Sequence, residues 1–238
     1  MPRAVLLDIE GTTTPISFVY DVLFPYARAR MDMFLQTHMS DPEAQTQIHL
    51  LREEHETDQE SETGPPAWDE ERDLDSAERY ALWLMDEDRK STVLKGLQGR
   101  IWTEGYRRCE LRSFVFPDVP PALERWHRAR RRIAIFSSGS ILAQKDLFAH
   151  TESGDLSQYI DKYFDTTVGA KQFSVSYTRI AARLGEAPED ILFVSDVVAE
   201  LDAARGAGYD TRLCIRPGNR PQPHTDSHAL IRSFDDLT

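Results

Sequence analysis

The sequence has few cysteines, no long apolar run and no excess of positive charge, and each absence excludes a class of protein. Its two cysteines, Cys109 and Cys214, form neither a disulfide framework nor a zinc-binding pattern, which favours a reducing compartment. No apolar stretch approaches the roughly 20 residues of a membrane-spanning helix, and the N-terminus lacks the apolar core of a secretion signal. We therefore expect a cytoplasmic protein with no membrane partner.

Negative charge is concentrated in one segment. The 238 residues include 40 Asp and Glu against 28 Lys and Arg, a formal net charge of −12. Residues 41–75 alone contain 13 acidic and two basic residues, so this window carries −11 and the rest of the chain −1. An acidic chain disfavours a nucleic-acid partner. Because the window contains no Asp-x-Asp-x-Asp-Gly calcium loop, we expect a solvated face rather than a metal site.

Short apolar runs alternate with amphipathic segments along much of the chain. The pattern predicts strands at 4–7, 133–136, 163–165, 191–194 and 211–215, and helices at 122–131, 141–148 and 177–184. Such alternation is typical of an α/β fold, a Rossmann-like parallel sheet with helices on both faces.

A long helical segment interrupts this pattern. Asp8 and Ser137 follow the first two predicted strands and stand 129 residues apart, whereas a crossover between parallel strands needs about 30 residues. Apolar residues in this interval recur at helical spacing. We predict an α/β core formed by residues 1–17 and 117–238, with an inserted all-helical cap at 18–116.

The first predicted strand ends in two carboxylic acids, Asp8 and Glu10. Two residues apart in an extended segment, they point to the same side. A carboxylate can attack phosphorus, and a second carboxyl can protonate the leaving oxygen and then activate water. Gly11 and Thr12 follow in a turn whose N–H groups can hold phosphoryl oxygens. The ordinary alternative is a strand end that happens to be acidic.

Polar residues follow other predicted strands as well. Ser137 and Ser138 precede a helix, where a hydroxyl and free N–H groups can bind an anion. Lys171 can neutralise a phosphoryl group, and Asp196, with Glu200 one turn later, can hold Mg²⁺. Each has an ordinary alternative, namely a serine N-cap, a surface lysine and an acidic first turn. Their shared position after the strands of a parallel sheet favours phosphoryl transfer.

The motifs 8–12, 137–138, Lys171 and 195–196 resemble those of the haloacid-dehalogenase-like phosphohydrolases. Most relatives carry Asp where this chain has Glu10. That glutamate, the threonines at 12–14 and the Arg-Pro-Gly-Asn segment at 216–219 are similar to the enolase-phosphatases (acireductone synthases) of methionine salvage. Relatives often have glycine near 109 and 113, where this chain has Cys109 and Ser113.

The resemblance implies a specific reaction. Such enzymes enolise 2,3-diketo-5-methylthiopentyl 1-phosphate and remove its phosphate to give acireductone, using Mg²⁺, which we expect at one ion per monomer. The implied catalytic residues are Asp8, Glu10 and Lys171. The implied metal ligands are Asp8, Glu10 through its main-chain carbonyl, and Asp196. The implied substrate-binding residues are Ser137, Ser138, Lys171 and Thr12. We expect a monomer whose partner is this small phosphorylated diketone.

Two other functions fit the same residues. One is a capped phosphatase of another small phosphorylated metabolite, and the other is a non-catalytic scaffold of the same fold. A scaffold could lose Asp8, Ser137, Lys171 or Asp196 without consequence, and all four are present.

Overall fold

The computed structural model describes residues 2–59, 64–223 and 225–237. The chain forms two compact units, Met1–Asp21 with Cys109–Thr238, and Val22–Arg108. The domain boundaries expected at 17/18 and 116/117 stay a prediction.

The first unit contains one parallel sheet in the order β3-β2-β1-β4-β5-β6. Its strands are β1 (Ala4–Leu7), β2 (Arg132–Phe136), β3 (Lys162–Phe164), β4 (Ile191–Ser195), β5 (Asp210–Cys214) and β6 (Ala229–Ile231). In register, Leu6 of β1 lies beside Ala134 of β2 and Phe193 of β4. All four residues of β1 are buried, as expected for a central strand covered on both faces.

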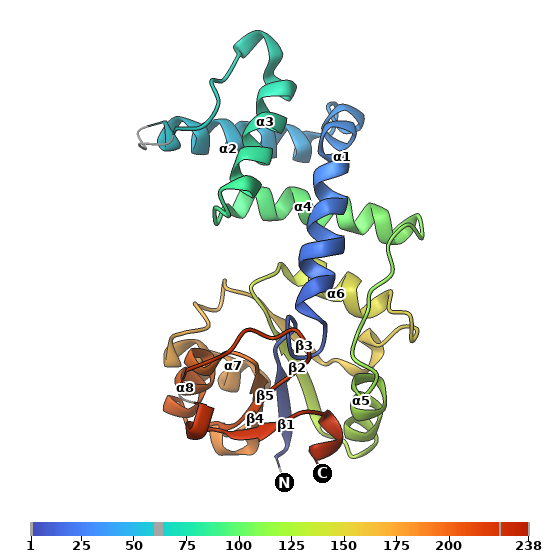
Figure 1. Ribbon diagram of the computed structural model, residues 1–238, viewed down its shortest axis with the longest axis vertical. Helices are drawn as coiled ribbons and strands as arrows, with labels where there is room; N and C mark the ends of the chain where they lie inside the picture. The colour runs from blue at the N-terminus through green and yellow to red at the C-terminus, as the bar shows by residue number, and fades with distance from the viewer. Residues whose placement is uncertain (1, 60–63, 224, 238) are drawn as a thin grey trace. The chain divides into compact units, whose positions relative to one another are not determined.

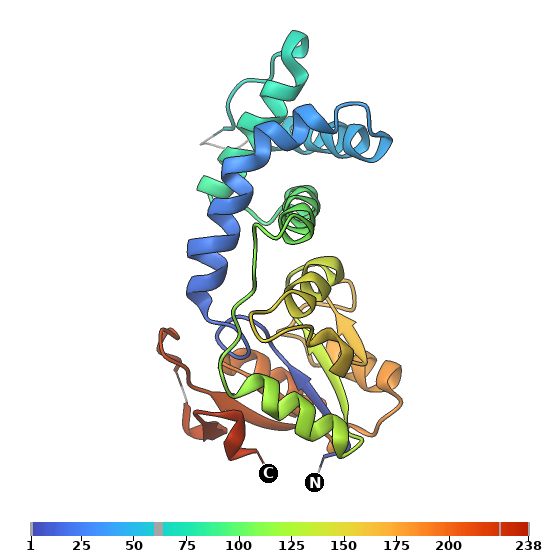
Figure 2. The same ribbon diagram turned by 90° about the vertical axis from the view of Figure 1, so that its right-hand side faces the viewer.

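Helices cover both faces of this sheet, with α5 (Val119–Arg128) and α6 (Ile141–Ala149) on one side and α7 (Ser174–Leu184) and α8 (Val198–Gly206) on the other (Figures 1 and 2). Alternate strand residues such as Leu6 and Phe193 pack with Tyr177 of α7 and Leu201 of α8. The predicted α/β fold is confirmed.

The second unit is helical, with α1 (Phe24–Thr37), α2 (Pro42–Asp58), α3 (Asp73–Asp86) and α4 (Thr92–Arg107) (Figure 1). Asp41 and Ser91 begin α2 and α4, because their side chains accept hydrogen bonds from the otherwise unpaired N–H groups of Glu43 and Leu94. The fully buried side chains of this core include Met31, Leu51, Tyr80, Ala81, Leu84 and Leu97. In the part of 22–108 that the structure describes there is no strand, and no described helix is long and apolar enough to cross a membrane.

The acidic segment 41–75 lies in this helical unit. Eleven of its 13 acids are described, and none of these is buried. Glu60 and Glu62 lie outside the described residues. Five of the eleven pair with arginines: Asp41 with Arg100, Asp58 with Arg89, and Glu56, Glu70 and Asp73 with Arg52. The expectation of a solvated acidic face agrees with these positions.

Two details of the sheet unit differ from the sequence-based expectation. A sixth strand, β6, pairs with β5 at the edge. Its apolar run, Ala-Leu-Ile at 229–231, is only three residues long, which is too short to be recognised as a strand from the sequence, and only Ile231 is buried. The helix expected to run to Arg131 ends at Arg128, because Arg130 has a left-handed φ of 58° and begins the turn into β2.

Candidate active site

The predicted site residues come from strands that are neighbours in the sheet. Asp8 follows β1, Ser137 follows β2, and Asp196 follows Ser195 at the end of β4. Since β2, β1 and β4 are parallel and adjacent, their carboxyl ends meet at the middle of one sheet edge. The topology therefore gathers motifs separated by up to 188 residues.

Asp8 and Glu200 share one buried lysine. The Nζ of Lys171 lies 2.5 Å from Oδ1 of Asp8 and 2.7 Å from Oε2 of Glu200, and the Lys171 side chain is only 9% exposed. Burial opposes its charge, but the two carboxylates outweigh this and raise the pKa of Lys171 above its ordinary value. Lys171 is therefore a fixed positive charge beside the carboxylate of Asp8.

Ser195 and Glu200 complete this cluster, although neither is among the residues to which the resemblance assigns a role. The Ser195 hydroxyl lies 3.0 Å from Oε2 of Glu200 and 3.4 Å from Oδ2 of Asp8, and it accepts a hydrogen bond from the N–H of Val197 at 3.1 Å. Burial raises the pKa of Glu200 to about 7 and Asp8 adds to the shift, while Lys171 opposes it. An acidic residue in the first turn of the helix that follows a site strand is the sequence signal for Glu200.

Glu10 belongs to the same electrostatic environment. Burial and the neighbouring Asp8 raise the pKa of Glu10 above its ordinary value, whereas Lys171 and a hydrogen bond with Ser137 oppose the shift. The charge of Asp8 thus disfavours a second charge on Glu10, and the hydroxyl of the second motif reaches Glu10.

The loop after Asp8 is tightly folded. Ile9 carbonyl accepts hydrogen bonds from the N–H groups of Thr12, Thr13 and Thr14 at 2.9–3.2 Å, and Gly11 N–H donates to Thr14 carbonyl at 2.7 Å. The Thr12 side chain is fully buried, and its hydroxyl has no hydrogen-bond partner among the described residues. Its substrate-binding role stays a prediction.

The Ser137–Ser138 turn is held from two sides. Ser137 is buried and accepts a hydrogen bond from Gly139 N–H at 3.2 Å, whereas Ser138 is exposed. Gln144 of α6 donates to the carbonyls of Gly139 and Phe164 at 2.7 and 2.9 Å, which fixes the turn against β3. Ser140, not Ser137 or Ser138, caps α6 by accepting from Ala143 N–H.

Asp196 packs against Gly11. A Cβ at Gly11 would lie 2.4 Å from Oδ2 of Asp196, so only glycine permits this approach. Burial, Asp8 and Glu200 together raise the pKa of Asp196 to about 7. Because these neighbouring carboxylates repel one another, a cation bound among them would stabilise their charged forms.

The donors at this edge are oxygens, the ligands that Mg²⁺ prefers. Among the described residues, no group of three His, Cys, Asp or Glu side chains could hold a metal ion. An ion beside Asp8 and Asp196 would therefore need main-chain or water oxygens as well, which suits Mg²⁺ and the predicted use of the Glu10 carbonyl.

Arg216 supports the loop after Asp8 from behind. Its Nε donates to Thr12 carbonyl at 3.2 Å, and its two terminal nitrogens bind the carboxylate of Asp118 at 2.9 and 2.8 Å. The guanidinium carbon lies 4.5 Å from the ring centroid of Phe116 and 4.9 Å from that of Phe234. This buried bidentate pair ties the loop after Asp8 to the start of α5.

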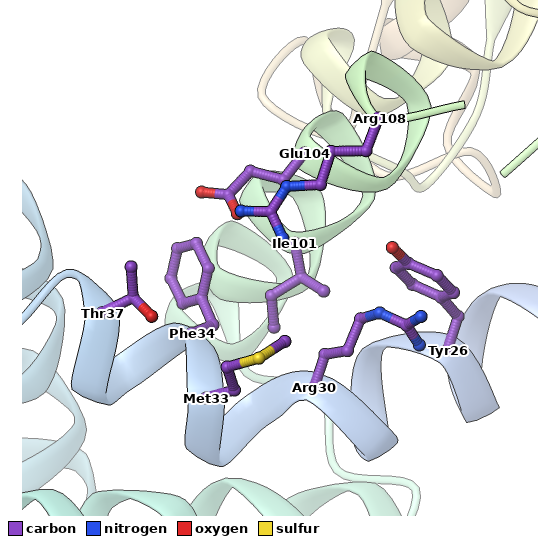
Figure 3. Close-up of a pocket in the computed structure, with 8 residues that line it drawn as sticks. All are labelled: Tyr26, Arg30, Met33, Phe34, Thr37, Ile101, Glu104 and Arg108. Atoms are coloured by element: carbon purple, nitrogen blue, oxygen red, sulfur yellow. The ribbon is translucent and has the colours of Figure 1, made fainter. Parts of the chain in front are cut away.

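The helical unit has a cavity of its own, of about 80 Å³, between α1 and α4 (Figure 3). Arg30 lies over the ring of Tyr26, 3.7 Å from its centroid, and Arg108 donates to Glu104. None of the predicted site residues lines this cavity.

Known proteins share both the sequence and the fold of this chain. The family profile of the haloacid dehalogenase-like hydrolases matches residues 2–208. An enolase-phosphatase E1 of Synechococcus elongatus is 52% identical over 233 residues, covering 98% of this chain and 96% of that protein. One from Leptospira borgpetersenii is 46% identical, with 98% and 96% covered. The solved structure of the UTR4 protein of Saccharomyces cerevisiae has a TM-score of 0.80 at 32% identity, covering 99% of each chain.

The chain therefore belongs to the haloacid dehalogenase-like hydrolases and, within them, to the enolase-phosphatase E1 family. The resemblance of its motifs predicted both. Dehalogenase structures, at 20% identity and a TM-score of 0.55, share the fold alone.

Proposed function

We propose that this protein is the enolase-phosphatase of methionine salvage, which converts 2,3-diketo-5-methylthiopentyl 1-phosphate to acireductone and phosphate. The observation that carries the proposal is the buried Lys171 between Asp8 and Glu200, at the edge where Glu10, Ser137 and Asp196 also gather. A buried lysine that stays charged beside a carboxylate supplies the positive charge needed when a phosphoryl group is transferred to that carboxylate.

Asp8 is the proposed nucleophile. Its carboxylate attacks phosphorus, the bond from phosphorus to the ester oxygen breaks, and water later cleaves the aspartyl phosphate to release inorganic phosphate. Lys171 holds the attacking carboxylate in place and neutralises the transferred group. Ser137, Ser138 and Thr12 complete the proposed phosphate site.

Glu10 is the proposed acid and base. Because its pKa is raised, its carboxyl holds a proton more readily than an ordinary glutamic acid and can give it to the departing oxygen. The resulting carboxylate can take a proton from the attacking water. The same group can also move the proton from carbon to oxygen during enolisation, since both tasks need a base beside the phosphorylated carbon.

Magnesium is the proposed cofactor, held by Asp8, Asp196 and the main-chain carbonyl of Glu10. When bound it supplies positive charge that screens the phosphate from the carboxylates. Asp196, with a pKa raised to about 7, would become a better ligand as the cation offsets its repulsion from Asp8. We further propose that the protein acts as a monomer in the cytoplasm, which sedimentation and cell fractionation would test.

The experiment is incubation of the purified protein with the diketone phosphate and Mg²⁺. We expect phosphate together with the absorbance of an enediol. Phosphate without the enediol would point to another phosphorylated metabolite as substrate, and no hydrolysis even of an aryl phosphate would identify a scaffold. Asp8→Asn should abolish turnover. Asp210→Asn, at the start of β5 and so at the opposite edge of the sheet, should not.

A further inference from the structure

Asn219 is the only asparagine of the 238 residues, and its side chain reaches the catalytic loop. It lies shortly after β5, in the segment 216–219. Its Nδ2 donates to Gly11 carbonyl at 2.9 Å and to Cys214 carbonyl at 3.2 Å. Both amide protons are therefore engaged, and the amide has one orientation only, because the flipped form would set its oxygen against two carbonyls.

This orientation aims the amide oxygen into the site. A Cβ at Gly11 would lie 2.9 Å from Oδ1 of Asn219 and 2.4 Å from Oδ2 of Asp196, so the two oxygens converge on the bare α-carbon of Gly11. Oδ1 of Asn219 is buried and has no hydrogen-bond partner among the described residues. A buried acceptor without a donor costs free energy unless something fills it.

The amide also has a mechanical role. Asn219 holds Gly11 carbonyl while Arg216 holds Thr12 carbonyl, so two consecutive peptide groups after Glu10 are fixed from outside the loop. An amide does this without charge. A carboxylate at 219 would add negative charge near Asp196, whose pKa burial and the charges of Asp8 and Glu200 already raise.

We propose that Asn219 is a positioning residue for phosphoryl transfer, which fixes Gly11 against Asp196 and offers Oδ1 to a proton donor, a water or hydroxyl, that enters with the phosphate. The inference builds on the proposed function, because it concerns the same site.

The kinetic test is Asn219→Asp, which keeps the shape of the side chain and removes both donors. With an aryl phosphate as substrate, we expect kcat to fall about 10- to 100-fold with KM changed less than about threefold, as for a displacement of a catalytic group by about 1 Å. The matched control is Asp161→Ala. It removes the hydrogen bond that the N–H of Ile133 in β2 donates to the Asp161 carboxylate at 2.7 Å, just before β3. It should lower the unfolding midpoint and leave kcat unchanged.

A spectroscopic test exploits the single asparagine. Protein labelled with side-chain ¹⁵N-asparagine gives one NH₂ pair, and two engaged protons should exchange slowly with solvent. Addition of Mg²⁺ and inorganic phosphate should shift that pair in wild type and in Asp161→Ala alike. Fast exchange of the amide protons with no shift of their signals would overturn the proposal. So would a kcat of Asn219→Asp within about twofold of wild type, or a loss of activity no larger than the unfolded fraction of that variant.

The two proposals fail differently. Wild type that hydrolyses an aryl phosphate but not the diketone phosphate would refute the substrate and leave the test of Asn219 intact. Wild type that hydrolyses neither substrate would refute the proposal that the protein is an enzyme. The NH₂ signals of Asn219 alone would then show whether this residue responds to phosphate.

Discussion

Gly11→Ala offers a sharp test of the site, because the chain contains a matched control. Gly11 and Gly185 have nearly the same left-handed φ, +72° and +73°. An added Cβ at Gly185, which ends α7, would meet nothing within 4 Å, whereas at Gly11 it would collide with Asp196. Comparing the two alanine variants separates backbone strain from the collision.

The expected magnitudes follow from these contacts. Each variant should lose about 1–2 kcal/mol of folding free energy, the cost of a side chain in the left-handed region. In Gly11→Ala, Oδ2 of Asp196 must retreat from 2.4 Å to an ordinary contact of at least 3.4 Å, a shift of about 1 Å that can lower turnover about 100-fold.

The assay measures kcat and the Mg²⁺ concentration that gives half-maximal rate on an aryl phosphate, together with urea unfolding. We expect Gly185→Ala to match wild type in both kinetic quantities. We expect Gly11→Ala to need more Mg²⁺ and to turn over far more slowly. If the two variants agreed within about threefold, the contact between Gly11 and Asp196 would have no catalytic consequence and the reasoning would be refuted.

Three further predictions concern charge and backbone. Lys171→Met should lower kcat at least about 100-fold while circular dichroism stays unchanged, because Asp8 and Glu200 lose their shared cation; a small loss would contradict its role. Asp118→Asn should destabilise the fold by about 3 kcal/mol at pH 7. Burial opposes ionisation of Asp118, but Arg216 lowers its pKa below the usual 3.8, so the stabilisation is present above that pH and lost below it. The difference in unfolding free energy between wild type and Asp118→Asn, measured by urea unfolding, should therefore shrink as the pH falls. An equal difference at pH 7 and pH 3 would count against the ion pair. Cys109→Gly should raise the unfolding free energy by up to about 1 kcal/mol, since Cys109 has a left-handed φ of 57°; a lower thermal midpoint would disprove this.

The central strands and their polar ends could be predicted because each leaves a local mark. An apolar run followed by Asp8, Ser137 or Asp196 is visible within a few residues. Parallel pairing then brings these ends together without further information. The predicted helical character of the second unit likewise follows from local periodicity.

The partners of each side chain could not be predicted, because they depend on contacts across the sheet. Nothing local to Glu200 shows that it shares Lys171 with Asp8. Nothing local to Asn219 shows that it reaches Gly11, 208 residues earlier. The edge strand β6 was not predicted because its apolar run of three residues is shorter than the runs that indicate a buried strand.

The position of β1 sets the order in which this protein can be completed during synthesis. β1 is made first, yet its two neighbours are β2 and β4, whose last residue is Ser195. At 5–20 residues per second, this apolar strand waits roughly 10–40 s on the ribosome for its second neighbour. Such long-range pairing folds slowly and leaves Ala4–Leu7 open to aggregation in the meantime. The strand that leads to the proposed nucleophile is therefore also a segment of the nascent chain that benefits from protection by a chaperone.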